Sequence, residues 1–262
     1  MHSSSLDLLQ ARAFAQTLAR EAAHLLQVGA AGQSTIEKAQ GDWCSALDSA
    51  IENHLRERIA AQYPTHRFWG EEGHIQGMAP EEGRFTWLVD PIDGSMNFLR
   101  GYPQYAIAIA VLDGSEPVAA CIMDPVRNEV FSASLGQGAD CNGRALQVAP
   151  TAQLSQAVAA TVFPKPRADF MDTYLAELSQ VLRQTAGVRR SGSMALEMAY
   201  LAAGRIDAFW ERGMGAWDAA AGRLLIHEAG GRVWSLDDRP WWQSQALASA
   251  TPPLCEAWDA LF

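Results

Sequence analysis

The chain has 262 residues, enough for one large domain or two closely packed halves, and a formal net charge of −10 at pH 7. Hydrophobic residues make up 48% of it and charged residues 19%, as in soluble globular proteins. The acidic balance argues against direct binding to nucleic acid or to an anionic membrane surface. The longest apolar run, YAIAIAVL at 105–112, is far shorter than the roughly 20 residues that span a bilayer.

Cysteine and histidine usage narrows the metal chemistry. Four cysteines lie far apart without a C-x-x-C pair, and six histidines are scattered without an H-E-x-x-H motif. This pattern favours a reducing cytoplasm and argues against disulfides and zinc clusters. The N-terminus lacks a basic region followed by an apolar stretch, so no secretory signal is predicted. A bound metal is expected to be hard and held by oxygen, as magnesium, manganese and calcium are.

Two helices are predicted near the N-terminus. Apolar residues at helical spacing over 5–28 predict a helix that ends at Gly29. Aliphatic residues in i, i+4 steps from Leu47 to Ile59 predict a second helix, starting near residue 45. The polar stretch GQSTIEKAQGD at 32–42, between them, is interpreted as a loop.

Strands follow from residue 85 to about 148. Four short apolar segments there are bounded by Gly, Pro or Asp, and CNGR at 141–144 predicts a hairpin turn. After residue 150, helices are expected near 167–184, 193–203 and 217–231, strands at 207–210 and 232–236, and a closing helix at the end. An antiparallel-rich half (1–150) and an alternating half (151–262) together predict stacked layers of sheet and helix.

The stretch WLVDPIDGSMNF, residues 87–98, carries the chemistry. Pro91 is expected to end a strand at Asp90, so that Asp90 and Asp93 turn toward one point. Two carboxylates this close repel each other unless a cation lies between them. The alternative is a turn whose aspartates only cap backbone groups.

The Gly-Ser pair that follows favours the functional interpretation. Gly94 permits close approach of the backbone to a ligand, and Ser95 is expected to be the N-cap of a short helix, SMNFLR. The free N–H groups of such a helix form a phosphate cradle. Carboxylates beside a phosphate cradle indicate a metal-assisted phosphatase.

Further acids complete an all-oxygen set. Glu71 and Glu72 follow a short aromatic strand in FWGEEG, and Asp218 opens a helix in GAWDAAAG. Each has a simpler explanation, an exposed acidic loop for the first pair and a favourable helix-dipole contact for Asp218. Together with residues 90–93 they offer ligands for more than one metal ion.

These motifs resemble those of the inositol monophosphatase family, which are magnesium-dependent, lithium-sensitive phosphatases. The resemblance rests on GEE at 70–72, on residues 87–98 and on WDAAAGRLLIHEAGG at 217–231. It continues through 37–48, 137–148 and 189–211 in the family's order, so it covers nearly the whole chain. It implies an α+β fold, a layered αβαβα sandwich of the sugar-phosphatase type, assembled as a homodimer.

The resemblance also implies metal ligands. Glu71, Asp90 and the main-chain carbonyl of Ile92 match a first Mg²⁺ site, and Asp90, Asp93 and Asp218 match a second. Glu71 with waters matches a weaker third ion, and Mn²⁺ is a substitute for Mg²⁺.

Roles in catalysis and binding follow in the same way. Asp48 and Ser95 match the pair that orients and deprotonates the attacking water, with Glu71 counted among the catalytic residues. Gly94 and Ser95 N–H groups are expected to bind phosphate, near Asp93 and Asp218. The remaining matches are the contacts to substrate hydroxyls (Gly192, Ser193, Met194 and Glu211) and a mobile loop near the third metal (Lys38, Asp42 and Glu72).

Two positions depart from the family. Ser95 replaces the usual threonine, keeping the hydroxyl and losing a methyl group, and Met96 stands where a second threonine is usual.

The sequence therefore predicts a cytoplasmic phosphatase of small polyol phosphates, with myo-inositol monophosphate as the first candidate and direct attack by water. Histidinol phosphate, fructose 1,6-bisphosphate and nucleotide 3′-phosphates stay open as substrates. An accessory role in transcription antitermination, through protein contacts, is the alternative from another class. A catalytically inactive relative is the third alternative, against which the intact acidic set argues.

Overall fold

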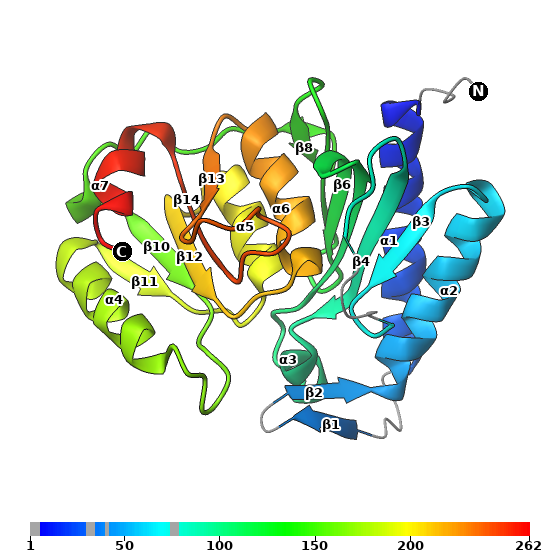
Figure 1. Ribbon diagram of the computed structural model, residues 1–262, viewed down its shortest axis with the longest axis horizontal. Helices are drawn as coiled ribbons and strands as arrows, with labels where there is room; N and C mark the ends of the chain where they lie inside the picture. The colour runs from blue at the N-terminus through cyan, green and yellow to red at the C-terminus, as the bar shows by residue number, and fades with distance from the viewer. Residues whose placement is uncertain (1–5, 30–34, 40–41, 74–78) are drawn as a thin grey trace.

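The structure is a computed structural model that describes residues 6–29, 35–39, 42–73 and 79–262. For residues 35–39 and 42–45 it describes the backbone only. Five layers lie side by side in the order helix, sheet, helix, sheet, helix (Figure 1), which confirms the predicted α+β fold class. The helix layers are α1 (Leu8–Gly29) with α2 (Ala46–Gln62), then α5 (Met194–Ala202) with α6 (Ala216–Glu228), then α4 (Met171–Gln184) with α7 (Cys255–Asp259).

The larger sheet has seven strands in chain order from β3 to β9. Only the first pair in this sheet is parallel, and each later pair is antiparallel. The CNGR turn is confirmed, since Cys141 pairs with Arg144 across it. The strands are β3 (Arg67–Gly70), β4 (Phe85–Asp93), β5 (Ala106–Asp113), β6 (Glu116–Asp124), β7 (Glu129–Ser134), β8 (Ala139–Cys141) and β9 (Arg144–Ala145).

The smaller sheet has five strands in the order β11-β10-β12-β14-β13. Its first two pairs are parallel and its last two antiparallel. The strands are β10 (Val158–Thr161), β11 (Gly187–Arg189), β12 (Ala208–Arg212), β13 (Arg232–Ser235) and β14 (Ala246–Ala250). Three of them, β10, β11 and β14, are absent from the sequence-based prediction.

Strand β5 shows how one sequence serves two layers. Its large residues Ile107, Ile109 and Val111 pack against α1 and α2, whereas its alanines face α5 and α6. Successive strand residues point to opposite faces, so this alternation decides which helix lies on which side. Small side chains on the inner face let the middle helices approach the sheet closely.

The predicted loop at 32–42 is wrong. Residues Thr35–Ala39 (β1) and Asp42–Ser45 (β2) form an antiparallel two-stranded sheet instead. The stretch was interpreted by its polar composition, but Thr35 and Ile36 are β-branched and favour strands. Backbone pairing with β2 satisfies the N–H and C=O groups that a loop would leave to water.

Helix ends agree with the predictions within a few residues, apart from the start of α4 at Met171 rather than near 167. The first helix ends at Gly29, as expected. In the described part of the chain, no helix is both long enough and apolar enough to cross a bilayer.

His66 gives the fold a dependence on pH. The indole Nε1 of Trp87 donates to His66 Nδ1 at 3.0 Å, so this nitrogen must be unprotonated. Burial lowers the pKa of His66 below its ordinary value of 6.5. The unfolded chain therefore binds this proton more readily than the folded protein. The contribution of His66 to stability is full above pH 6.5 and is lost as the pH falls from there toward the folded-state pKa.

We expect the free energy of unfolding to decline more steeply on acidification in the wild type than in His66→Gln. Glutamine keeps an acceptor for the Trp87 indole and does not titrate. Urea midpoints measured in a pH series across the ordinary histidine pKa check this. Parallel curves for the two proteins would show that His66 is not the group responsible.

Candidate active site

The two aspartates of the central motif lie on one strand with an irregularity between them. Strand β4 runs through Pro91 to Asp93, so the expectation that it ends at Asp90 is wrong. Asp90 pairs with Ala108 and Asp93 with Ala106, so three steps on β4 match two on β5. This β-bulge, at which proline is tolerated, turns both carboxylates to the face covered by α5 and α6.

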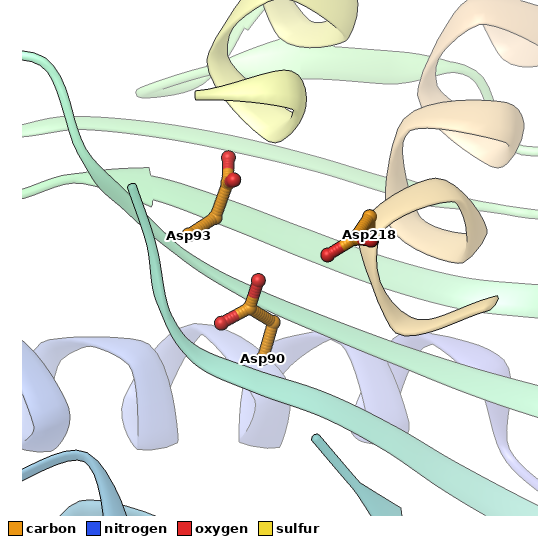
Figure 2. A group of neighbouring side chains, drawn as sticks. All are labelled: Asp90, Asp93 and Asp218. Carbon is orange, nitrogen blue, oxygen red and sulfur yellow. The ribbon is translucent and has the colours of Figure 1, made fainter. Parts of the chain in front are cut away.

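A third aspartate reaches the same place from α6. Carboxylate oxygens of Asp90, Asp93 and Asp218 lie within 4.8 Å of one another. Figure 2 shows the three side chains converging on a common space from the bulged strand and from the first turn of α6. Asp218 is fixed there because the backbone N–H of Gly215 donates to its Oδ2 at 2.6 Å.

The electrostatics of this cluster are unfavourable without a cation. Asp90 is 1% exposed, and its burial, together with repulsion from Glu71, Asp93 and Asp218, holds its pKa well above the ordinary range. Burial and the neighbouring Asp218 raise the pKa of Asp93 to about 7. Divalent cations remove this conflict because their charge favours the ionised carboxylates.

The donors fit a hard metal ion. All are carboxylate oxygens, which magnesium, manganese and calcium prefer. The cluster could therefore bind metal, because a cation would relieve the repulsion between carboxylates brought together by β4 and α6.

Asp93 is held by the N-terminus of α5. Ser193 Oγ donates to it at 2.5 Å, and the backbone N–H groups of Ala195 and Met194 donate at 2.7 Å and 3.3 Å. These donors, and the positive end of the helix dipole, favour the ionised form. Ser193 is also the N-cap of α5, accepting from the N–H of Leu196.

Glu71 joins the cluster at the end of β3. Its backbone N–H donates to Val89 O at 3.1 Å, which places the residue beside β4. Its side chain is one of the charges that raise the pKa of Asp90. The next residue, Glu72, is held by its backbone N–H, which donates to Oε2 of the buried Glu52 at 2.7 Å.

The Gly94-Ser95 turn forms the rim of the site. Gly94 has φ 93° and is the N-cap of the short helix α3 (Ser95–Leu99). Ser95 is therefore the first helical residue, not the N-cap that was predicted. A Cβ on Gly94 would lie 3.1 Å from the carbonyl oxygens of Gln104 and Gly192, so this glycine is needed for the turn itself.

A hydroxyl and a buried carboxylate adjoin the cluster. Ser95 Oγ lies 2.9 Å from Asp48 Oδ1 and also 2.9 Å from the carbonyl oxygen of Ile92. A hydroxyl has one proton to donate, so these two acceptors share it. Asp48 is 1% exposed and lies in the first turn of α2.

Glu211 on β12 lines the same cavity as Ser95. It is 9% exposed, and no described residue hydrogen-bonds to its buried Oε2. Burial and repulsion from Asp218, Asp93 and Glu197 raise its pKa well above the ordinary value, while Lys165 acts in the opposite direction.

Most of these groups line one cavity of about 440 Å³, whereas Asp48 and Glu72 are not among its lining residues. It contains most of the predicted site residues, namely Glu71, Asp90, Ile92, Asp93, Gly94, Ser95, Gly192, Met194, Glu211 and Asp218. Ser193 lies behind the wall and binds Asp93 instead. Lys38 and Asp42 belong to β1 and β2, and their side chains lie outside the described part of the chain.

Two further residues belong to the site and were missed in the sequence. Lys165 lines the cavity, and nothing in its local sequence marks it. Asn97 donates to the carbonyl oxygens of Gln104 at 2.6 Å and Ser191 at 2.8 Å, tying the Gly94 turn to the loop before α5. Both depend on contacts between segments far apart in the chain.

Comparison with known proteins now identifies the class to which this fold and site belong. The sequence profile of the inositol monophosphatase family matches residues 7–259. The chain is 43% identical over 202 residues to the Nus factor SuhB of Pseudomonas aeruginosa, covering 76% of this chain and 74% of that one. It is 44% identical over 201 residues to the inositol-1-monophosphatase of Rhizobium meliloti, with coverage of 76% and 74%.

A solved structure agrees over more of the chain. That of inositol monophosphatase from Anabaena (Nostoc) sp. PCC 7120 matches with a TM-score of 0.84 at 32% identity, covering 98% of this chain and 95% of that one. The chain belongs to the inositol monophosphatase family, as the sequence motifs indicated.

Proposed function

We propose that this protein is a Mg²⁺-dependent phosphatase of small polyol phosphate monoesters, with myo-inositol monophosphate as its substrate. The observation that carries the proposal is the convergence of Asp90, Asp93 and Asp218 beside the Ser95–Asp48 pair. Membership of the family and the similarity to a named inositol-1-monophosphatase support it.

The metal would be held by the carboxylates of the cluster. Glu71, Asp90 and the Ile92 carbonyl are assigned to one ion, and Asp90, Asp93 and Asp218 to a second. Glu71 would also serve a weaker third ion, with Glu72 nearby. When bound, such ions supply Lewis-acid stabilisation of the phosphoryl group and lower the pKa of water.

Ser95 and Asp48 would handle the proton of the attacking water. As the water oxygen forms its bond to phosphorus, its proton passes to Ser95 Oγ, and the Ser95 proton passes to Asp48 Oδ1. The phosphorus–oxygen bond to the alcohol breaks with its electron pair on the alkoxide, which takes a proton from solvent. The 2.9 Å contact between the two side chains supports this relay.

The remaining groups would position the substrate. Backbone N–H groups of Gly94 and Ser95, at the start of α3, are assigned to phosphate oxygens. Glu211, Gly192 and Met194, which line the same cavity, are assigned to the polyol hydroxyls. A buried carboxylate without a protein partner for Oε2 suits a hydroxyl donor.

Phosphate release tests the proposal. The substrates are inositol 1-phosphate, histidinol phosphate, fructose 1,6-bisphosphate, adenosine 3′,5′-bisphosphate and β-glycerophosphate, each with Mg²⁺, with EDTA and with added lithium. We expect magnesium-dependent release led by inositol 1-phosphate and inhibited by lithium. Faster release from another of these substrates would support the proposed reaction but assign a different substrate. No phosphate release from any of them would refute the proposal that the protein is a phosphatase.

A second candidate function rests on a relative. The 43% identical protein of Pseudomonas aeruginosa is named a Nus factor, which favours an accessory role in transcription antitermination. An active-site variant separates the two functions. If Asp90→Asn abolishes phosphate release and keeps the transcriptional role, the binding surface is independent of the chemistry.

Three other expectations stay predictions. They are the division into halves at about residue 150, the homodimer and the cytoplasmic location. Sedimentation of the purified protein tests the second of them.

A further inference from the structure

A second large cavity lies away from the proposed active site. It is a groove of about 710 Å³ between α6, β13, the start of β6 and the segment formed by Pro252–Leu254 and α7. It shares no lining residue with the active-site cavity. Its volume lies in the range of cavities that hold small molecules.

Arg223 of α6 is the unusual group in this groove. Its Nε is sealed from solvent and has no hydrogen-bond partner, and no described residue forms a hydrogen bond or ion pair with its guanidinium. Its guanidinium carbon lies 5.0 Å from the ring centre of Trp241, which holds it in place. Burial lowers the pKa of Arg223, so the fold keeps this charge at a free-energy cost.

The other charged groups of the groove affect an anionic ligand less than Arg223 does. It is the least exposed charged side chain of the groove. Glu116 is close enough to favour its charged form but makes no ion pair with it, and Glu116 is solvent-exposed. Glu256 and Asp259 also line the groove and are exposed, and Asp259 accepts from the indole of Trp234. Exposed carboxylates are screened by water and salt, whereas a partly buried cation is screened much less.

Apolar surface continues from Arg223 along the groove. Leu224 follows it on α6, Pro117 lies at the start of β6, and Val233 and Trp234 lie on β13. A cation beside an apolar wall is complementary to a ligand that joins one anionic group to an apolar body.

We propose that this groove binds a small organic anion whose acidic group pairs with Arg223 and whose apolar body lies against Leu224, Val233 and Trp234. A planar guanidinium can pair with a carboxylate, sulfonate or phosphate through more than one N–H donor. The site is independent of the proposed phosphatase function, since it rests on different residues.

The test uses two probes that differ in charge. Anilinonaphthalene sulfonate is an apolar anion, and phenylnaphthylamine is its uncharged counterpart. Both are titrated into the full chain with Mg²⁺ and without phosphate, and Trp217, which lines the active-site cavity, reports any binding there. Indole N–H signals in a proton–nitrogen NMR spectrum, assigned with Trp234→Phe and Trp241→Phe, report the location. We expect the sulfonate to shift the Trp234 and Trp241 signals and to leave that of Trp217 unchanged.

Variants of Arg223 then decide the role of the charge. Arg223→Met keeps length and apolar contact with Trp241, and is expected to weaken sulfonate binding about tenfold without changing phenylnaphthylamine binding. Arg223→Lys keeps the charge but loses the planar set of donors, so its affinity for the sulfonate should lie between those of the wild type and Arg223→Met. Arg232→Met, at an exposed cation of the same groove, is the matched control and should have little effect.

Three outcomes would overturn the proposal. They are no sulfonate binding, a shift only of Trp217, or equal binding of both probes by the wild type. If Arg223→Met does not fold, the comparison of the two probes on the wild type and on Arg223→Lys still decides.

Discussion

Asp90→Asn is expected to reduce phosphate release about 1,000-fold while making the metal-free protein more stable. Asp90 is assigned to two metal ions, and each is worth several kcal/mol of transition-state stabilisation. Since every 1.36 kcal/mol is tenfold in rate, losing about 4 kcal/mol gives this factor. Fixed-time phosphate release with Mg²⁺ in excess measures the loss.

Asp90→Asn should raise the stability of the metal-free protein, although it lowers activity, because it removes a charge that its neighbours repel. The carboxylate is 1% exposed and is repelled by Glu71, Asp93 and Asp218. Asparagine keeps an Oδ1 acceptor for the N–H of Ile92, now 3.0 Å from Asp90 Oδ1, and carries no charge. Replacing a buried, uncompensated charge in this way stabilises a fold by about 1–2 kcal/mol. Calorimetry in EDTA should therefore show a higher melting temperature for the variant.

Adding Mg²⁺ should make the wild type more stable than Asp90→Asn, the reverse of the order expected in EDTA. Wild-type protein gains stability from binding, whereas the variant gains little. Asp124→Asn is the matched control, because Asp124 is also fully buried in the larger sheet but pairs with Arg127 and accepts N–H groups of Val126 and Arg127. That variant should lose stability in both buffers. If Asp90→Asn behaves like it, Asp90 is a structural carboxylate and the metal assignment fails.

Local patterns predicted the larger sheet well and the smaller one poorly. In the larger sheet, segments such as YAIAIAVL combine aliphatic residues with clear boundaries. By contrast β10 (VAAT) and β14 (ALASA) are rich in alanine, which is depleted in strands. They form strands because they are buried between helix layers, where small residues fit. That cause is tertiary and leaves no local signal.

The candidate site was also predicted only in part. The acids and the Gly-Ser pair were found from their order in the sequence, and the structure places Asp90, Asp93 and Asp218 together. Their assignment as metal ligands stays a prediction. The bulge at Pro91 was not found, because proline was interpreted only as a strand end. Yet the bulge is the reason that residues three apart share one face of β4.

Residues that act through others were also missed. Ser193 was expected at the substrate, but its hydroxyl donates to Asp93 and fixes that carboxylate. Asn97 on α3 donates to the carbonyl oxygen of Ser191, which lies 94 residues further along the chain. A motif shows which residue types are present, whereas their direction depends on how distant segments pack.

Asp48→Asn is expected to cause a large loss of catalytic rate, which tests the proposed proton relay. Asparagine accepts a hydrogen bond from Ser95 Oγ through Oδ1, as Asp48 does at 2.9 Å, but it cannot take the proton. Loss of a general base typically lowers the rate 100- to 10,000-fold, so we expect kcat to fall about 1,000-fold. KM and the Mg²⁺ requirement should change little, because no metal ligand has been altered. Steady-state kinetics at several Mg²⁺ concentrations separates these parameters.

Substitutions of Ser95 complete the argument. Ser95→Ala should match the loss in Asp48→Asn, and the double variant should be no slower than either, because two residues in one relay act as a unit. Ser95→Thr keeps the hydroxyl and restricts its rotamer, so it should retain activity. Additive losses in the double variant would show that Asp48 and Ser95 act separately. A large rise in KM for Asp48→Asn would instead assign Asp48 to substrate binding, and the base would then have to be sought among the carboxylates of the cluster.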